Sequence, residues 1–311
     1  MKLYIGVTDN NWYSFLAQHQ PDEVNFWRPG GKYFRAIEPG GMFLFKLHSP
    51  LNFIAGGGFF VRYSRLPVSL AWETFGNKNG TSDYSAFLRT IHRYRRTDPH
   101  TEHDPVIGCI VLASPFFFDR SDWIPAPQDW NSNIVQGKSY ATDTFIGKSL
   151  VRQVQEKLQN RQINGFNQNT SWSEEEGERY GAGHIVYPRL GQGAFRVVVT
   201  EAYNRRCAIT GEKTLPVLEA AHIKPYSQQG PHHPANGILL RQDLHTLFDR
   251  GYMTVSPDFH IEVSKKIKED FGNGRDYYAL HGSKLREVPQ NTIERPSREF
   301  LEWHNQNRYL G

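Results

Sequence analysis

The chain has 311 residues, 38% of them hydrophobic and 22% charged, with a formal net charge of +4 and a pI near 8.9. A globular protein of this length is large enough for two packed cores, and the composition excludes a low-complexity or strongly polybasic chain. The mildly basic balance is compatible with a polyanionic partner.

The cysteine content and the amino terminus indicate the compartment. The two cysteines, Cys109 and Cys207, lie far apart in the sequence. The first residues, MKLYIGVTDNNWYSF, lack the positive segment and long apolar core of a signal peptide. No stretch approaches the roughly 18 uninterrupted apolar residues of a membrane span. We therefore expect a reduced, cytoplasmic protein without a membrane segment.

The first half of the chain mixes strand and helix patterns. Short apolar runs rich in β-branched and aromatic residues predict strands, and apolar residues at helical spacing predict helices. Strands are expected at 3–7, 42–47, 53–63 and 106–118, and helices at 68–76, 82–96 and 142–158. Because these elements do not alternate as regular βαβ units, we expect an α+β fold with a small closed or half-closed β-barrel and flanking helices.

A polar, aperiodic segment separates the two halves. It runs from about 160 to 193 and contains the charged run SEEEGE. Such a composition is typical of a linker or a long loop. We expect an N-terminal domain over 1–159, a linker over 160–189 and a C-terminal domain over 190–311.

The patterns in the second half of the chain predict a strand, a loop, a strand and a helix in this order. An amphipathic helix over 194–207, ending near Arg205, comes first and is followed by the turn ITGE. LPVLEAAHI then predicts a strand, SQQGPHHPAN a polar loop, GILL a second strand, and RQDLHTLFDRG a helix that Gly251 ends.

Three polar residues occupy chemically meaningful places in this order. His222 ends the first strand, Asn236 opens the second and His245 lies in the helix. Hydrolysis of a phosphodiester needs a base for water and a cation for the developing charge, and a ββα unit can present both. A lone histidine beside an apolar run is usually structural, so the spacing and the order of all three carry the prediction.

Several blocks in this half resemble the HNH (ββα-metal) endonucleases, in the branch of predicted restriction endonucleases. They are GQGAFR (191–196), AYNRRCAITGE (202–212), LEAAHIKPY (218–226), NGILLRQDLHTLFDRGYMTV (236–255) and RPSREFLEWH (295–304). The resemblance implies a C-terminal ββα-metal nuclease domain. It implies that His222 is the general base, that Asn236 orients it or binds metal, and that His245 ligates Mg²⁺, Mn²⁺ or another divalent ion.

The chain departs from that family at two places. Many members carry a metal ligand immediately before the catalytic histidine, where this chain has Ala221. Glu219, which shares a strand face with that position, and Asp243 are the candidates for the missing carboxylate. Cys207 lacks the partners of a zinc-binding CxxC pair, so no structural zinc is expected.

The remaining polar residues near this motif carry weaker expectations. Asp249 and Gly251 are expected to shape the helix end. The loop residues His232 and His233 are expected to be solvated.

The first domain carries patches such as FFVRYS (59–64) and WIPAPQDW (123–130). With the strand order, they resemble the PUA-like superfamily of EVE, ASCH and YTH domains over about residues 1–155. The resemblance implies a reader that holds a modified or flipped base between aromatic rings. The candidate pocket residues are Trp27, Tyr33, Tyr63, Trp72 and Trp130, although most aromatic residues must be core. Arg28, Lys32 and Arg62 are the candidates for contacts with the DNA backbone. The run 89–96 is either a further candidate for such contacts or a solvated helix face.

Together these patterns favour a modification-dependent DNA endonuclease. Its N-terminal domain would read 5-methyl- or 5-hydroxymethylcytosine in double-stranded DNA by base flipping, and its HNH site would cut nearby. Cleavage of both strands implies a homodimer. Two alternatives stay open: a sequence-specific HNH restriction endonuclease on unmodified DNA, protected by a methyltransferase, and a catalytically inactive protein that binds modified nucleic acid.

Overall fold

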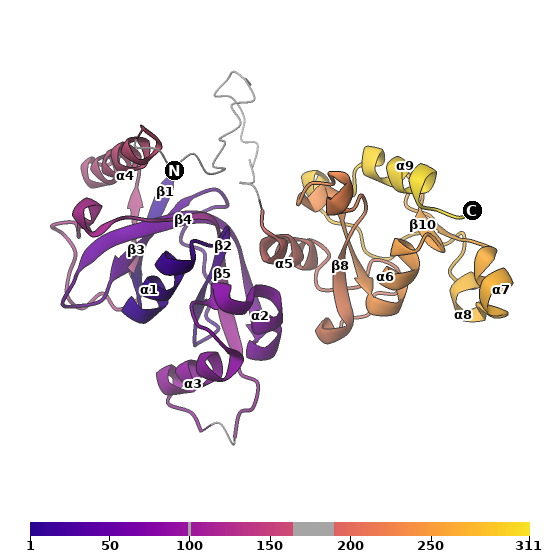
Figure 1. Cartoon of the computed structure of the whole chain (residues 1–311), viewed down its shortest axis with the longest axis horizontal. Helices are drawn as coiled ribbons and strands as arrows, with labels where there is room; N and C mark the ends of the chain where they lie inside the picture. Colours follow the sequence, from indigo (N-terminus) through magenta and orange to yellow (C-terminus); the bar gives the residue numbers. More distant parts are fainter. Residues whose placement is uncertain (99–100, 164–189) are drawn as a thin grey trace. The chain divides into compact units, whose positions relative to one another are not determined.

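The computed structural model describes residues 1–98, 101–163 and 190–311. The chain divides into two compact units, Met1–Pro188 and Arg189–Gly311 (Figure 1). Most of the expected linker, residues 164–189, lies outside the described residues. No helix in the described ranges is both long enough and apolar enough to cross a membrane.

A seven-stranded mixed sheet forms the N-terminal unit. The strands are β1 (Lys2–Thr8), β2 (Glu23–Arg28), β3 (Met42–Leu47), β4 (Phe53–Pro67), β5 (Val106–Phe117), β6 (Ile124–Pro125) and β7 (Gly137–Ala141). They are ordered β2-β5-β4-β3-β1-β7, and β6 pairs with β4. Only the β1–β3 pair of this sheet is parallel. The combination of this sheet with helices confirms the α+β class.

The long strand β4 bends the sheet. Its register against β5 shifts between Gly57 and Phe59 and again between Phe60 and Arg62. Such bulges bend a strand and increase its twist. A Cβ atom on Gly56 would overlap the carbonyl oxygen of Phe116, so glycine permits the close approach of the two strands here.

Four helices accompany this sheet: α1 (Asn10–His19), α2 (Val68–Phe75), α3 (Tyr84–Arg95) and α4 (Phe145–Ile163). Alternating side chains of β1 and β3 reach two separate cores. Tyr4, Phe43 and Phe45 pack with Trp12 and Leu16 of α1, whereas Leu3, Ile5 and Leu44 pack with Leu150 and Val154 of α4. Each face of the sheet therefore has its own helical cover.

The four expected strands and three expected helices of this unit are present, the strand at 42–47 with its predicted bounds and the others with shifted ends, but α1, β2, β6 and β7 were not predicted. A sequence signal for α1 existed, because the carboxylate of Asp9 accepts hydrogen bonds from the backbone of Asn11 and Trp12. This is an ordinary N-terminal helix cap.

The C-terminal unit follows the predicted order of strand, loop, strand and helix. The elements are α5 (Gln192–Ala202), β8 (Leu218–His222), β9 (Gly237–Arg241), α6 (Gln242–Asp249), β10 (Met253–Val255), β11 (Ile261–Val263), α7 (Lys266–Phe271), α8 (Arg275–Tyr278) and α9 (Arg298–Asn307). α5 ends before the predicted Arg205, because Asn204 and Arg205 adopt positive φ angles of 53° and 58°.

A single buried core unites this ββα unit with α5. Phe195 and Val199 of α5 pack with Leu239 of β9 and with Leu244 and Phe248 of α6. β8 pairs antiparallel with β9, so that His222 lies opposite Gly237. Short 3₁₀ helices occur at Gly76–Asn79, Arg120–Asp122, Leu215–Val217, Tyr226–Gln228, Pro234–Asn236 and Thr292–Glu294.

Candidate active site

His222 lies half-buried at the end of β8. Its ring stacks on Phe195 of α5, with ring centroids 3.9 Å apart and an interplanar angle of 11°. Burial, reinforced by the nearby His232, lowers the pKa of His222 to about 4. The imidazole is therefore neutral at neutral pH and holds a lone pair that can accept a proton.

His232 lies beside His222, although we expected it to be solvated. The Nε2 atom of His222 is 2.9 Å from the Nδ1 atom of His232. The His232 ring also stacks on Tyr226, with centroids 4.4 Å apart. His233 is half-buried as well, and its Nδ1 atom accepts a hydrogen bond from the backbone of Ala235. The expectation of two solvated histidines is therefore wrong, because the loop folds back onto β8.

Asn236 is fully buried and ties this loop together. Its Oδ1 atom accepts a hydrogen bond from the Lys224 backbone nitrogen at 2.8 Å. Its Nδ2 atom donates to the carbonyl oxygens of Lys224 and Pro231, at 2.9 and 3.0 Å. These contacts clamp both ends of the loop between β8 and β9. They support an orienting role for Asn236 rather than metal ligation.

His245 lies in α6 between two carboxylates. Its Nδ1 atom is 2.6 Å from Oε2 of Glu219, and its Nε2 atom is 3.2 Å from Oδ2 of Asp249. Burial works to lower the pKa of His245, but the hydrogen bonds and charges of Asp249 and Glu219 outweigh it and raise the pKa. The two carboxylates therefore give His245 a negative environment that favours a positive charge on its ring.

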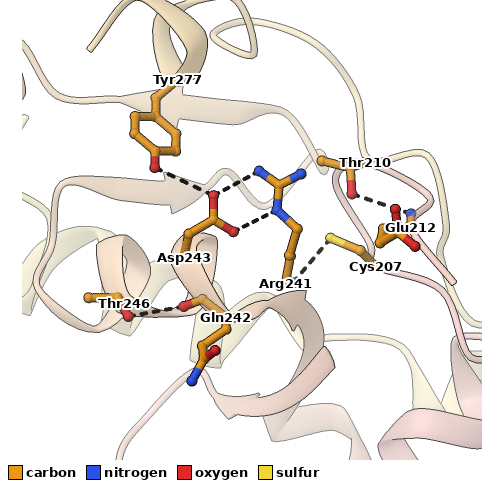
Figure 2. Close-up of polar contacts among 8 residues, drawn as sticks. All are labelled: Cys207, Thr210, Glu212, Arg241, Gln242, Asp243, Thr246 and Tyr277. Atoms are coloured by element: carbon orange, nitrogen blue, oxygen red, sulfur yellow. Dashed lines mark hydrogen bonds and ion pairs between the residues drawn. The ribbon is translucent and has the colours of Figure 1, made fainter. Parts of the chain in front are cut away.

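Asp243, the other candidate carboxylate, belongs to a different network (Figure 2). Its two oxygens accept hydrogen bonds from Nε and Nη2 of Arg241, at 2.6 and 2.7 Å, and Tyr277 lies 3.4 Å away. Residues two apart on a helix face different directions, so Asp243 does not share the face of His245. The structure thus brings Glu219, and not Asp243, to His245.

Asp249, which was expected only to shape the helix end, contacts His245 and joins the candidate site. It lies one turn after His245 on the same face of α6. The spacing of four residues between a histidine and an aspartate in a helix was the available signal.

The side chains around His245 offer a donor set for a divalent ion. Glu219, His245 and Asp249 supply carboxylate oxygens and imidazole nitrogen, which Mg²⁺, Mn²⁺ and related ions accept. As placed, both ring nitrogens of His245 face carboxylates, and the described ranges contain no group of three or more His, Cys, Asp or Glu residues arranged to hold a metal ion. Glu219 and Asp249 lie at different nitrogens of the His245 ring, so an ion bound at Nε2 could be reached by Asp249, while Glu219 would accept the Nδ1 proton and orient the ring.

The candidate pocket residues of the N-terminal unit do not form one pocket. Trp27 and Trp72 both contact Phe87 of α3, with ring centroids 5.6 and 6.1 Å from it. The Nε1 atom of Trp27 donates a hydrogen bond to the backbone oxygen of Asn79. Trp130 lies elsewhere, with the Nζ atom of Lys46 5.4 Å from its ring. The expected single set is therefore dispersed, because these residues reach different faces of the sheet.

Tyr33 and Tyr63 do lie together, with ring centroids 5.8 Å apart. The hydroxyl of Tyr63 donates to the backbone oxygen of Lys32 at 2.9 Å, and Tyr33 is 69% exposed. The Arg28 guanidinium lies 5.1 Å from the Phe34 ring, and its Nη2 atom donates to the hydroxyl of Tyr4. We call Arg28, Lys32, Tyr33 and Tyr63 the tyrosine patch.

The other proposed cations lie apart from this patch. Arg62 precedes Tyr63 on β4, and consecutive strand residues point to opposite faces. Within the 89–96 run, Arg95 donates hydrogen bonds to the backbone oxygens of Pro29 and Val106 and pairs with Glu102. Arg95 therefore stabilises the fold of the N-terminal unit through these contacts.

Comparison with known proteins agrees with the C-terminal motif. Residues 207–256 match the sequence model of the HNH endonuclease family. The matched segment contains β8, β9 and α6, and it confirms the HNH resemblance of this unit. A search of curated proteins gave no match.

Two solved structures illustrate the similarity in three dimensions. The ASCH protein from Zymomonas mobilis is 11% identical, with a TM-score of 0.30, and covers 48% of this chain and 93% of its own. The modification-dependent restriction endonuclease TagI is 12% identical, with a TM-score of 0.30, and covers 93% of this chain and 76% of its own. An ASCH protein, one of the PUA-like types expected from the sequence, is thus among the similar structures.

Proposed function

We propose that the protein is a metal-dependent DNA endonuclease in which His222 is the general base. The observation that carries the proposal is the pairing of a neutral, half-buried His222 at the end of β8 with the acidic cluster around His245 on α6. Hydrolysis of a phosphodiester needs such a base next to a cation site.

The chain's own residues divide the chemistry between them. His222 accepts the proton of a water whose oxygen forms a bond to phosphorus, while the bond to the leaving oxygen breaks and its electron pair stays on that oxygen. A divalent ion held by Nε2 of His245 and by Asp249, with Glu219 accepting the Nδ1 proton of His245, would supply the positive charge for the phosphate and the leaving oxygen. Asn236 orders the loop that borders His222.

The N-terminal unit is proposed to read a modified cytosine, 5-methyl or 5-hydroxymethyl, flipped from double-stranded DNA. The exposed ring of Tyr33 offers a stacking surface, and the guanidinium of Arg35 lies 5.7 Å from it. Aromatic stacking replaces part of the energy that a flipped base loses, and nearby cations hold the backbone. We propose the tyrosine patch as this reader surface. We further propose that the protein is cytoplasmic and that it cuts both strands as a homodimer.

Cleavage of one plasmid in three forms tests the proposal. The forms are unmodified, 5-methylcytosine and 5-hydroxymethylcytosine DNA, each incubated with Mg²⁺ or Mn²⁺. We expect cutting of a modified form only. His222→Ala should lower its rate by about 10²–10⁴-fold, the usual contribution of a general base. His260→Ala, a histidine of the same unit outside the cluster, serves as the matched control.

Two other outcomes would support the alternative functions. Cutting of all three forms with the same dependence on His222 supports a sequence-specific nuclease and rejects the cytosine reader. Binding of modified DNA without cutting in any divalent metal supports an inactive binder and rejects the nuclease.

A further inference from the structure

We infer that His232 is a positioning residue that holds His222 in the tautomer and orientation required of the base. The inference rests on the proposed role of His222. It starts from the 2.9 Å contact between Nε2 of His222 and Nδ1 of His232. The two residues are ten positions apart, on β8 and in the loop before β9.

The His222 ring is held on its face and at its edge. Phe195 covers one face at a centroid distance of 3.9 Å, and His232 meets the Nε2 edge. His232 is in turn stacked on Tyr226, with an interplanar angle of 10°. A ring held in this way cannot rotate without breaking a stack or a hydrogen bond, and a fixed orientation is what a general base needs.

The hydrogen bond also selects a tautomer. Only one proton lies between the two nitrogens, and in neutral imidazole one nitrogen donates while the other accepts. If Nε2 of His222 donates to Nδ1 of His232, Nδ1 of His222 keeps its lone pair for the proton of the water. If His232 donates instead, the Nε2 lone pair of His222 is occupied and Nδ1 carries the remaining proton. We assign the first arrangement to the active protein.

Asn236 connects this pair to the loop clamp. It binds the backbone of Lys224 and Pro231, and Pro231 immediately precedes His232. Loss of the Asn236 amide should therefore displace His232 and disturb His222 indirectly. The positions of His232 and Asn236 thus explain how a buried amide without a contact to the reacting groups can support the base.

Three substitutions of His232 in the full chain test the hydrogen bond. His232→Ala removes the acceptor. His232→Asn restores an amide oxygen near the place of Nδ1, whereas His232→Gln places its amide near Nε2. We expect Ala and Gln to lower kcat by about 10–100-fold, the range measured for partners that orient a ligand or base, with unchanged KM, and Asn to recover most of the loss. His233→Asn, which keeps an acceptor for Ala235, is the matched control.

A second measurement does not depend on activity. In protein labelled with ¹⁵N-histidine, the imidazole nitrogen shifts report which nitrogen of His222 is protonated, and His222→Asn assigns its signals. We expect protonated Nε2 in the wild type and in His232→Asn, and a mixture of tautomers in His232→Ala. Thermal unfolding of each variant identifies any that fails to fold. If His232→Ala fails to fold, the comparison of His232→Asn with His232→Gln tests the positioning role.

The outcomes separate the two proposals. A wild type that cuts DNA, with His232→Ala and His232→Gln equally active, overturns the positioning role and leaves the nuclease intact. A His222 ring protonated at Nδ1 in the wild type overturns it as well. A wild type that cuts no DNA rejects the proposed function, while the nitrogen shifts still decide whether His232 selects the tautomer of His222.

Discussion

The Nδ1 atom of His245 lies 2.6 Å from the Oε2 atom of Glu219, which joins the helix of the ββα unit to its first strand. Glu219 lies two positions before Ala221 on β8 and shares a strand face with it. The same imidazole meets Asp249 through its other nitrogen.

Removing either carboxylate should weaken metal binding. We expect Glu219→Gln and Asp249→Asn to lower the affinity for Mn²⁺ at least about tenfold, because Asp249 lies at the Nε2 atom that would face the ion and Glu219 orients the ring through Nδ1. Isothermal titration of the full chain with MnCl₂ measures the affinity directly, without a cleavage assay.

Asp243→Asn is the control for that experiment. Its carboxylate binds Arg241 on another face of α6, so we expect unchanged Mn²⁺ affinity. Because these two side chains are 36% and 39% exposed, the loss of their ion pair should cost only about 0.5–1 kcal/mol of unfolding free energy. Loss of Mn²⁺ binding in Asp243→Asn, with binding retained in Asp249→Asn, would refute the assigned donor set.

Gly237→Ala should destabilise the C-terminal unit. The added Cβ would overlap Cγ2 of Val199 and lie 3.0 Å from Cζ of Phe195, both of them in the buried core. Overpacking of this kind costs about 1–3 kcal/mol, and a shift of Phe195 also disturbs its stack on His222. Urea unfolding measures the loss. Gly30→Ala, whose Cβ meets nothing within 4 Å, should show no packing penalty.

His304 should make the stability depend on pH. It is 2% exposed and stacks on Phe248, and burial lowers its pKa to about 4, from an ordinary value of 6.5. The unfolded chain therefore binds a proton below pH 6.5 that the folded chain accepts only near pH 4. Stability should fall by about 3 kcal/mol as the pH drops through this window, and stay at its full value above it.

His304→Gln tests this dependence, because glutamine does not titrate. We expect the variant to be less stable than the wild type at pH 7, with a smaller loss of unfolding free energy between pH 6.5 and 4. His222 contributes the same background slope to both proteins. Identical slopes in urea unfolding across this range would contradict the assignment to His304.

Tyr33→Ala should weaken the binding of modified DNA. Loss of one stacking contact costs about 1–3 kcal/mol, which corresponds to roughly 5–150-fold in affinity. Fluorescence anisotropy with duplexes that differ only in one 5-methylcytosine measures the effect. Phe145→Ala removes an aromatic side chain of the same unit that is 90% exposed, and it should bind as the wild type does. Equal affinities of Tyr33→Ala and the wild type would exclude the tyrosine patch as the reader surface.

Local sequence patterns were sufficient to predict the elements of the ββα unit and their order. The apolar runs and turn residues between 215 and 251 predicted strand, loop, strand and helix in the observed order, because each element is short and its apolar pattern is local. The reader candidates show the opposite case. Trp27 and Trp72 look like pocket residues in the sequence but meet at Phe87, because sheet faces and register decide which aromatic residues come together.

Contacts between elements were decided by the tertiary structure. Glu219 and Asp243 were equal candidates in the sequence, and the phase of α6 against the pleat of β8 brought only Glu219 to His245. His232 came to His222 because Asn236 folds a polar loop through bonds that span it. Such contacts depend on which residues a folded loop brings close to the neighbouring strand. The order of residues in the sequence does not specify this.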